Sequence, residues 1–343
     1  MRKWLNTLFV TSEDAYLALE NENVVVWQGE ERRGQYPLLI LEGIISFSYK
    51  GASPALMGEC VKRGVSLCFL TRNGRFLARA CGEGNGNVLL RKQQYRFSDS
   101  ETDSCAIARN MIFGKVYNGR WLLERALRDH ALRIDADQIR LVSRQMADQL
   151  QAIAACQTLD SLRGIEGELS ARYFGVFDQL ILNQKETFRY DGRNRRPPQD
   201  PVNALLSFTY TLLANDCAAA LESVGLDAYV GFLHRDRPGR SSLALDLMEE
   251  LRPALADRLV LTLINTREIQ GKHFQRQAGG VVLLNDEGRK LLLTAWQSRK
   301  KEELTHPYLK EKVPWGLVPY VQSLLLARYI RGDLDGYPPF LWK

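Results

Sequence analysis

The pattern of hydrophobic and polar positions changes character between residues 82 and 91. The first part of the chain contains short runs of β-branched, aromatic and leucine residues, such as VVVWQ, PLLILEGIISFSY and VSLCFL, which are separated by NEN, GEERRG and RNG. Short apolar runs between polar turn residues are typical of β-strands. We therefore expect strands throughout this part, with one short helix around residues 54–62.

The second part of the chain has apolar residues at helical spacing over long stretches, as in AIARNMIFGKVYNGRWLLERALRDHALRI. This periodicity predicts a series of long helices. One helix has boundary signals at both ends: Asp200 as the N-cap residue, Pro201 at the first helical position and Gly225 as the stop. The second part is therefore expected to be helical throughout.

Between the two parts lies CGEGNGN, whose alternating glycines indicate a flexible linker rather than a phosphate-binding loop. The predicted fold class is α+β, with two domains. We expect a β domain over residues 1–82, a linker over 83–90 and an all-α domain over 91–343.

Composition narrows the class of protein and of partner. The 343 residues are 45% hydrophobic and 25% charged, which is ordinary for a globular protein with more than one core. The net charge of +6 favours an anionic partner, and nucleic acid is preferred over a membrane surface. The longest stretch without charge, residues 201–215, is too short to span a bilayer. The first residues also lack the apolar core of a signal peptide.

Six cysteines are spread over the chain without a C-x-x-C pair. This spacing argues against a structural zinc site and against a disulfide framework. A reducing cytoplasm is the expected location.

The stretch YVGFLHRDRPGRSSLALDLMEELRP places an acid-rich helix after a cationic loop. Asp246, Glu249 and Glu250 are three and four positions apart, so they share one side of the helix. One interpretation is an ordinary polar stripe that faces solvent. The other is a site for Mg²⁺ or Mn²⁺ that His234 completes. The loop also carries cations suited to a phosphate backbone, which a bare acidic cluster would repel: Arg235, Arg237 and Arg240.

A second basic loop, FRYDGRNRRPPQDP, precedes the helix that starts at Pro201. Its arginines Arg193, Arg195 and Arg196 either belong to a solvated connection or hold nucleic acid. Both interpretations remain open from the residues alone.

The segment RGIEGELSARYF contributes one more candidate acid, Glu166. Gly164 and Gly167 flank it, and a glycine inside a helix costs about 1 kcal/mol relative to alanine. We therefore expect another backbone to approach closely at these glycines. Glu168 should point to a different face of the helix.

The three blocks RGIEGELSARYF, DPVNALLSFTYTLL and YVGFLHRDRPGRSSLALDLMEELRP, in this order, resemble the CRISPR-associated integrase family, protein one of the CRISPR adaptation complex. The resemblance covers essentially the whole chain. GASPALMGEC, NGRF and the ending YPPFLWK are similar to the form found in subtype I-C systems. The family fold implies an N-terminal β-sandwich-like domain that mediates dimerisation, followed by an all-α catalytic and DNA-binding domain.

The resemblance also implies a catalytic metal site. Its ligands for Mg²⁺ or Mn²⁺ would be Glu166, His234 and Glu249, with Asp246 as a supporting acid. The family often has aspartate at the position of Glu249. Asn203 falls on a recurring family position behind the ligands, although it could equally be a helix-start residue that satisfies backbone groups.

The implied activity is metal-dependent DNA integration, together with endonuclease activity, in antiviral defence. Short foreign DNA fragments would be inserted as new spacers at the leader–repeat end of a CRISPR array, by attack of a 3′-hydroxyl on a phosphodiester. The implied partners are double-stranded DNA, a second copy of the chain, the small ferredoxin-like protein two and an iron–sulfur nuclease that trims fragments, with no membrane involved. The alternatives are a non-catalytic nucleic-acid-binding protein and an assembly scaffold that uses the aromatic tail at residues 337–342.

Overall fold

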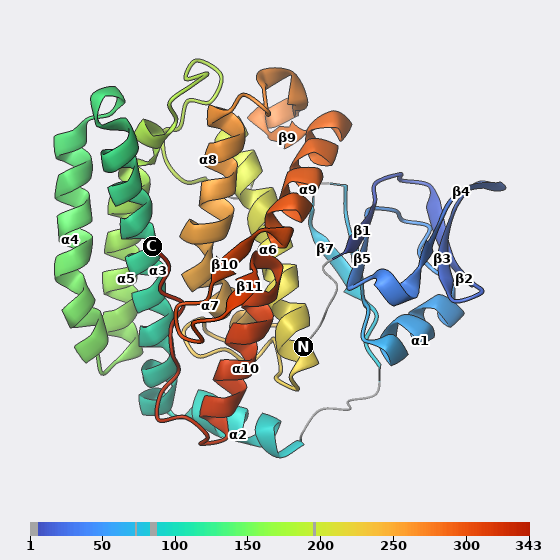
Figure 1. The fold of residues 1–343 in the computed structure, drawn as a ribbon, viewed down its shortest axis with the longest axis horizontal. Helices are drawn as coiled ribbons and strands as arrows, with labels where there is room; N and C mark the ends of the chain where they lie inside the picture. The colour runs from blue at the N-terminus through green and yellow to red at the C-terminus, as the bar shows by residue number, and fades with distance from the viewer. Residues whose placement is uncertain (1–5, 73, 83–87, 195–196) are drawn as a thin grey trace.

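The computed structural model describes residues 6–72, 74–82, 88–194 and 197–343. A strand-rich N-terminal region lies on one side of the molecule and a larger helical region on the other (Figure 1). The chain is thus a mixed α/β protein with the predicted order of strands before helices.

The N-terminal region contains two sheets and one helix. The first sheet has the order β1-β5-β6-β7, in which β1, β5 and β6 are parallel and β7 is antiparallel. Its strands are β1 (Thr7–Val10), β5 (Gly43–Ser46), β6 (Ser66–Leu70) and β7 (Phe76–Arg79). The second sheet is an antiparallel meander of β2 (Ala15–Glu20), β3 (Asn23–Gln28) and β4 (Glu31–Pro37). The helix is α1 (Pro54–Arg63), which starts with Ser53 as N-cap and ends at Gly64 with a φ of 68°.

The first sheet is covered on both faces. Ile44 and Leu67 point into a core shared with the meander and α1. Ile45 and Leu70 belong instead to the large core of the helical region. Both β5 and β6 are consequently almost fully buried, which explains their unbroken apolar runs.

Aromatic and ionic contacts also join the two regions. The ring of Phe47 stacks on that of Phe208, with 6.1 Å between centroids. The buried ammonium of Lys300 lies 3.3 Å from Asp216 and 3.7 Å from Glu42 in the sheet region. The predicted linker is only partly described, since residues 83–87 lie outside the described residues and residues 88–90 already begin a helix.

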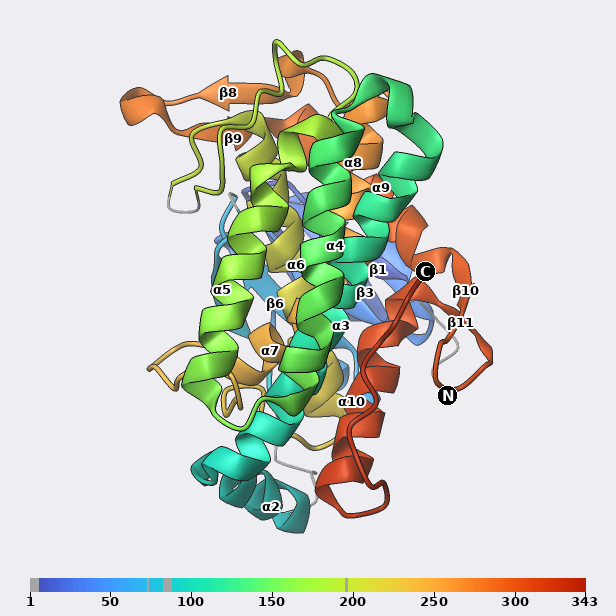
Figure 2. The same ribbon diagram turned by 90° about the vertical axis from the view of Figure 1, so that its left-hand side faces the viewer.

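The helical region is built from nine α-helices in the described residues: α2 (Val88–Asp99), α3 (Glu101–His130), α4 (Ala136–Ala155), α5 (Leu159–Gly175), α6 (Pro201–Ser223), α7 (Ser242–Leu251), α8 (Arg258–Asn265), α9 (Asp286–Lys301) and α10 (Val318–Ile330). A π-helical turn, Arg252–Asp257, connects α7 to α8. Helices α3, α4 and α5 run alongside one another (Figure 2).

The prediction of an all-α second domain is wrong, because the helical region also contains four short strands. These form two antiparallel pairs, β8 (Phe274–Arg276) with β9 (Val282–Leu284) and β10 (Glu303–Thr305) with β11 (Lys312–Pro314). Each strand has three residues, which is too short for an alternating pattern to stand out from the flanking helices.

Helix α6 runs through the centre of the helical region. It begins as predicted, because the carboxylate of Asp200 accepts the backbone N–H of Asn203 at 2.8 Å and Pro201 is the first helical residue. Among the described residues it is the one helix long and apolar enough to cross a membrane, yet 67% of its apolar window is buried inside the protein. It packs against α7 and α10, as a core helix does.

The C-terminal tail folds back over α3 and fastens α7 (Figure 1). Asn118 of α3 donates to the backbone oxygens of Glu250 and Phe340, at 2.7 and 2.8 Å, and accepts the backbone N–H of Trp342 at 2.8 Å. The Glu250 carboxylate accepts the hydroxyl of Tyr337 and the backbone N–H of Phe340. The helix that carries Glu249 is therefore held between α3 and the tail.

Replacing Asn118 should loosen this three-way junction. Asn118→Ala removes three buried hydrogen bonds and leaves their partners unsatisfied, so we expect the free energy of unfolding to fall by about 3 kcal/mol. Urea unfolding measures this change. The control is Gln151→Ala on the exposed face of α4, which should change stability little, and equal stability of the two variants would contradict the assigned role.

Candidate active site

The three acids of α7 are buried and face different neighbours. Asp246, Glu249 and Glu250 are 0%, 3% and 0% exposed. The interpretation of these residues as a solvent-facing stripe is therefore wrong. Because charged groups are rarely buried without partners, the partners of each acid define what it does.

Asp246 holds the loop that carries His234. Its carboxylate accepts the backbone N–H groups of Phe232, Leu233 and His234 at 2.6, 2.9 and 3.0 Å, and lies 2.5 Å from the Nδ1 atom of His234. Gly231 makes this close approach possible, since a Cβ atom there would stand 2.8 Å from the carboxylate. Asp246 thus fixes both the backbone and the ring of His234.

The His234 ring presents its second nitrogen away from Asp246. The side chain is 21% exposed, and no described residue forms a hydrogen bond with Nε2. Arg163 of α5 steadies the same loop by donating to the backbone oxygen of Leu233 at 2.7 Å. A histidine whose Nδ1 is bound to a carboxylate is a common arrangement for metal ligation through Nε2.

Glu166 and Glu249 come from different helices and share one cation. The ammonium of Lys115, on α3, donates to the carboxylate of Glu166 on α5 and lies 2.9 Å from that of Glu249 on α7. Arg252 lies 3.0 Å from the other oxygen of Glu249. The hydroxyl of Ser170 donates to Glu166 at 2.8 Å. Two carboxylates predicted to bind a metal thus converge on one positive charge.

Electrostatics keep Glu249 ionised. Burial by itself would raise the pKa of this carboxyl group, but Coulombic interactions with neighbouring groups, chiefly Arg252 and Lys115, outweigh burial and lower its pKa to about 2. All three predicted ligands belong to one electrostatic unit.

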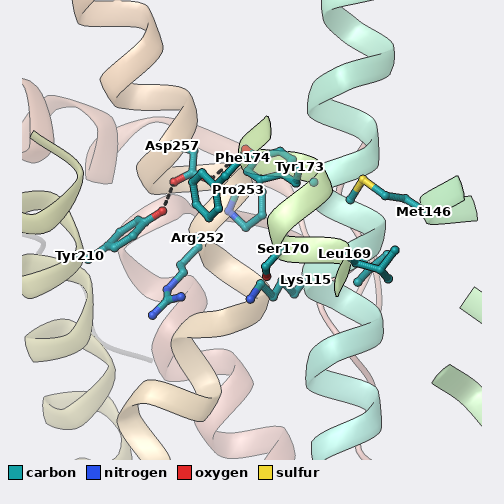
Figure 3. A pocket seen from close by; sticks show the side chains of 12 residues that line it. Lys115, Met146, Leu169, Ser170, Tyr173, Phe174, Tyr210, Arg252, Pro253 and Asp257 are labelled. Atoms are coloured by element: carbon teal, nitrogen blue, oxygen red, sulfur yellow. Dashed lines mark hydrogen bonds between the residues drawn. The ribbon is translucent and has the colours of Figure 1, made fainter. Parts of the chain in front are cut away.

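A small cavity adjoins this unit (Figure 3). Lys115 and Arg252 line it, together with the buried carboxylate of Asp257. Asp257 accepts the hydroxyls of Tyr173 and Tyr210 at 2.9 and 2.5 Å, and burial raises its pKa to about 6. Arg252 lies over the ring of Tyr210, 4.8 Å from its centroid. The tyrosine–aspartate group thus positions Arg252 beside Glu249.

The donor set fits a divalent cation, but the ligands are not gathered into a finished site. Within the described residues, no three His, Cys, Asp or Glu side chains lie close enough together to hold a metal ion. Two carboxylates and one imidazole nitrogen are donors suited to Mg²⁺ or Mn²⁺. Since both carboxylates already share the ammonium of Lys115, they could take a metal ion once Lys115 moves aside.

The predicted DNA-binding arginines differ in their surroundings. Arg235 and Arg237 are exposed in the loop after His234, where Arg235 lies 3.3 Å from Asp160, and Arg240 is partly buried. Arg193 is turned inward, donating to the side-chain oxygen of Asn203 and lying 5.2 Å from the ring centroid of Tyr210. Arg195 and Arg196 lie outside the described residues.

Asn203 fastens the loop before α6. It donates to the backbone oxygen of Gly192 at 2.8 Å and to Asp200 at 2.7 Å, and accepts from Arg193. It touches neither Glu166 nor Glu249. Its described contacts are those of a helix-start residue, and Arg193 connects it to the ring of Tyr210.

The expectation of a close backbone contact at the glycines beside Glu166 is wrong. A Cβ atom at Gly164 or Gly167 would meet no atom within 4 Å, and both positions are exposed. The glycines instead leave the surface next to Glu166 open. Glu168 points elsewhere, as predicted, and pairs with Arg172 at 2.6 Å.

Comparison with known proteins identifies the family. A family model described as CRISPR associated protein Cas1 matches residues 8–298. The chain belongs to this family. It is 52% identical to a CRISPR-associated endonuclease Cas1 of Rhodospirillum rubrum, with 100% of both chains covered. It is 36% identical to a CRISPR-associated exonuclease Cas4/endonuclease Cas1 fusion of Geobacter sulfurreducens, over 98% of this chain and 60% of the fusion.

Solved structures share the Cas1 fold. A casposase bound to integration product superposes with a TM-score of 0.84 at 22% identity, covering 98% of this chain and 94% of the casposase chain. A Cas6-RT-Cas1–Cas2 complex superposes with a TM-score of 0.82 at 21% identity, covering 100% of this chain and 36% of that chain. At these identities the likeness establishes the fold of this Cas1-family chain.

Sequence reasoning missed two residues that pair with the predicted ligands, Lys115 and Arg252. Arg252 follows Glu249 by three positions on a helix, and that spacing is a signal for an ion pair that could have been used. Lys115 has no comparable signal, because it lies in a long helix far from both carboxylates in sequence. Only the packing of α3 against α5 and α7 brings it there.

The depressed pKa of Glu249 predicts a pH dependence of stability. Since the folded-state pKa of about 2 lies below the unfolded value near 4.5, the ionised carboxylate stabilises the fold by about 3 kcal/mol above pH 4.5. That contribution is lost as pH falls from 4.5 toward 2. The stability difference between wild type and Glu249→Gln should therefore narrow over this range, as measured by urea unfolding in EDTA.

The matched control is Glu168→Gln, because Glu168 is an exposed acid on α5. Its stability difference from wild type should vary far less with pH. If the free energies of unfolding of wild type and Glu249→Gln changed with pH in parallel, Glu249 would not be held ionised by its neighbours.

Proposed function

We propose that this chain is a metal-dependent DNA endonuclease and integrase of CRISPR adaptation. It inserts short foreign DNA fragments as new spacers at the leader–repeat end of a CRISPR array. The observation that carries the proposal is the convergence of Glu166 and Glu249 on one largely buried cation, Lys115, beside a histidine whose Nε2 faces away from its carboxylate partner. Membership of the Cas1 family and the relatives' designation as endonucleases support it.

The proposed chemistry is a transesterification at phosphorus. The 3′-oxygen of the incoming fragment forms a new bond to the scissile phosphorus, the bond to the target strand's 3′-oxygen breaks, and the proton of the attacking hydroxyl is lost as the leaving oxygen gains one. Glu166, His234 and Glu249 would hold Mg²⁺ or Mn²⁺, which polarises the phosphate and stabilises charge on the leaving oxygen. Endonuclease activity is the same displacement with water as the attacking group.

Other residues prepare the site for this reaction. Asp246 keeps the ring of His234 oriented, and Arg252 adds positive charge beside Glu249 that favours the approach of a phosphate. Arg235 and Arg237, exposed in the next loop, extend this charge toward the DNA backbone. The open surface at Gly164 and Gly167 gives a strand room to reach Glu166.

Assignment to CRISPR adaptation also implies partner proteins. The fused relative supports a Cas4-type iron–sulfur nuclease as a separate partner of this chain, and the fold shared with a Cas1–Cas2 complex supports the small ferredoxin-like companion. We assign dimerisation to residues 1–82, where large apolar side chains are exposed, and catalysis to residues 91–343. The exposed side chains include Tyr16, Tyr36, Leu39, Ile40 and Tyr49. We further propose a subtype I-C system acting in the cytoplasm, without a membrane partner.

The second candidate is a non-catalytic nucleic-acid-binding protein. It would share the basic loops but would need no metal. Its premise of a solvent-facing acidic stripe conflicts with the burial of Asp246, Glu249 and Glu250.

Strand transfer tests the proposed function. A short duplex with 3′-hydroxyl ends, a supercoiled plasmid carrying a leader and repeat, and the companion should give joined product with Mn²⁺ and none with EDTA. His234→Ala should lower joining by about 100-fold or more, because it removes a ligand. His130→Ala, at the exposed end of α3, should keep wild-type activity. Binding without joining by the wild type would favour the non-catalytic candidate.

The salt dependence of DNA binding tests the loop arginines. Each lost phosphate contact should reduce the slope of log affinity against log salt by about 0.9, so Arg235→Ala/Arg237→Ala should reduce it by roughly 2. Arg140→Ala/Arg144→Ala removes equal charge from the exposed face of α4 and serves as the control. Equal slopes for the two double variants, in fluorescence anisotropy, would exclude the loop from the DNA contact.

A further inference from the structure

The two carboxylates of the proposed metal site already hold a cation that belongs to the chain. The ammonium of Lys115 bonds to Glu166 and lies 2.9 Å from Glu249. Its side chain is only 14% exposed. Lys115 thus stands where the two carboxylates converge, rather than beside them.

No other described side chain makes this connection. Arg252 pairs with Glu249 but not with Glu166, and the remaining side-chain partner of Glu166 is the neutral hydroxyl of Ser170. Without Lys115, the two negative groups would lose their shared counter-ion. In the metal-free protein, Lys115 therefore links α5 to α7 through these two carboxylates.

An ammonium and a divalent ion exclude each other from this position. Mg²⁺ keeps oxygen ligands at about 2.1 Å, so a metal ion bound by both carboxylates would occupy the space of the ammonium and repel it. Lysine can leave, because its charge sits on a flexible four-carbon stem. Arg252 stays behind, held by Tyr210 and still paired with Glu249.

We propose that Lys115 is a built-in competitor of the catalytic metal, which bridges Glu166 and Glu249 until a divalent ion displaces it. The proposal rests on the proposed function, since it takes these carboxylates as metal ligands. When the metal ion displaces Lys115, its ammonium loses both carboxylate partners and remains as an unpaired positive charge at the edge of the site. A DNA phosphate supplies an anionic partner, so metal and DNA should each strengthen the binding of the other.

Calorimetric titration with Mn²⁺ measures the competition. Lys115→Met keeps the apolar stem and removes the charge, so the full chain carrying it should bind Mn²⁺ about tenfold more tightly than wild type. In EDTA, Lys115→Met should have a lower melting temperature than wild type. Added Mn²⁺ should raise the melting temperature of this variant more than that of wild type. Lys290→Met, at an exposed position on α9, should match wild type in both measurements.

Amine labelling separates displacement from a general loss of charge. N-hydroxysuccinimide acetate, followed by mass spectrometry, should label Lys115 of the wild type weakly in EDTA and several-fold more strongly with Mn²⁺. Labelling of Lys290 should stay constant. A long-range charge effect on metal affinity would not change the accessibility of Lys115.

Each outcome decides the proposal. If wild type binds Mn²⁺ but Lys115→Met binds it equally or more weakly, or if labelling of Lys115 does not rise, Lys115 is not a competitor and the proposed function stands. If neither the wild type nor the control variant Glu168→Gln binds Mn²⁺, the proposed metal site does not exist. The competition proposed for Lys115 is then excluded as well.

Discussion

The buried negative charge of Glu249 is the constraint on which the centre of this molecule depends. A carboxylate that is 3% exposed needs positive partners, and Lys115 and Arg252 supply them from α3 and from the turn after α7. Arg252 is in turn placed by Tyr210 and Asp257. The packing of α3, α5, α6 and α7 around one another is therefore tied to a small set of charges, and the site is assembled by the same contacts that stabilise the fold.

The neighbouring acids Asp246 and Glu250 fix α7 to two different segments of the chain. Asp246 binds three consecutive backbone N–H groups and the ring of His234, and so fixes the loop that carries this proposed ligand. Glu250 binds the C-terminal tail through Tyr337 and Phe340. One short helix thus connects the loop of His234, the carboxylate of Glu249 and the C-terminal tail. A displacement of the tail would shift Glu250 and therefore also the neighbouring residue Glu249.

Much of this could be predicted from the sequence, and the limits have physical causes. The order of strands and helices, the start of α6 and the acids of α7 all follow from local periodicity and capping signals. The role proposed for Glu166 rests on the family resemblance, because its local signal, the flanking glycines, predicts a close backbone contact that the structure does not have. Lys115 was missed because its partners are 51 and 134 positions away, as its pairs with Glu166 and Glu249 show. The three-residue strands were missed because they are too short to show a period. Arg193 is a candidate for DNA binding from its basic loop, whereas the fold places it over the ring of Tyr210, a contact that only tertiary packing creates.

We propose that the charges around Glu249 form a metal site in which Lys115 takes the place of the metal ion when no metal is bound. Anomalous diffraction from a crystal grown with Mn²⁺ tests it most directly. We predict one anomalous peak bound by Glu166, Glu249 and the Nε2 atom of His234, with the Lys115 ammonium displaced from between the carboxylates. A structure without a peak there, with Lys115 still bridging Glu166 and Glu249 at saturating Mn²⁺, would contradict the claim.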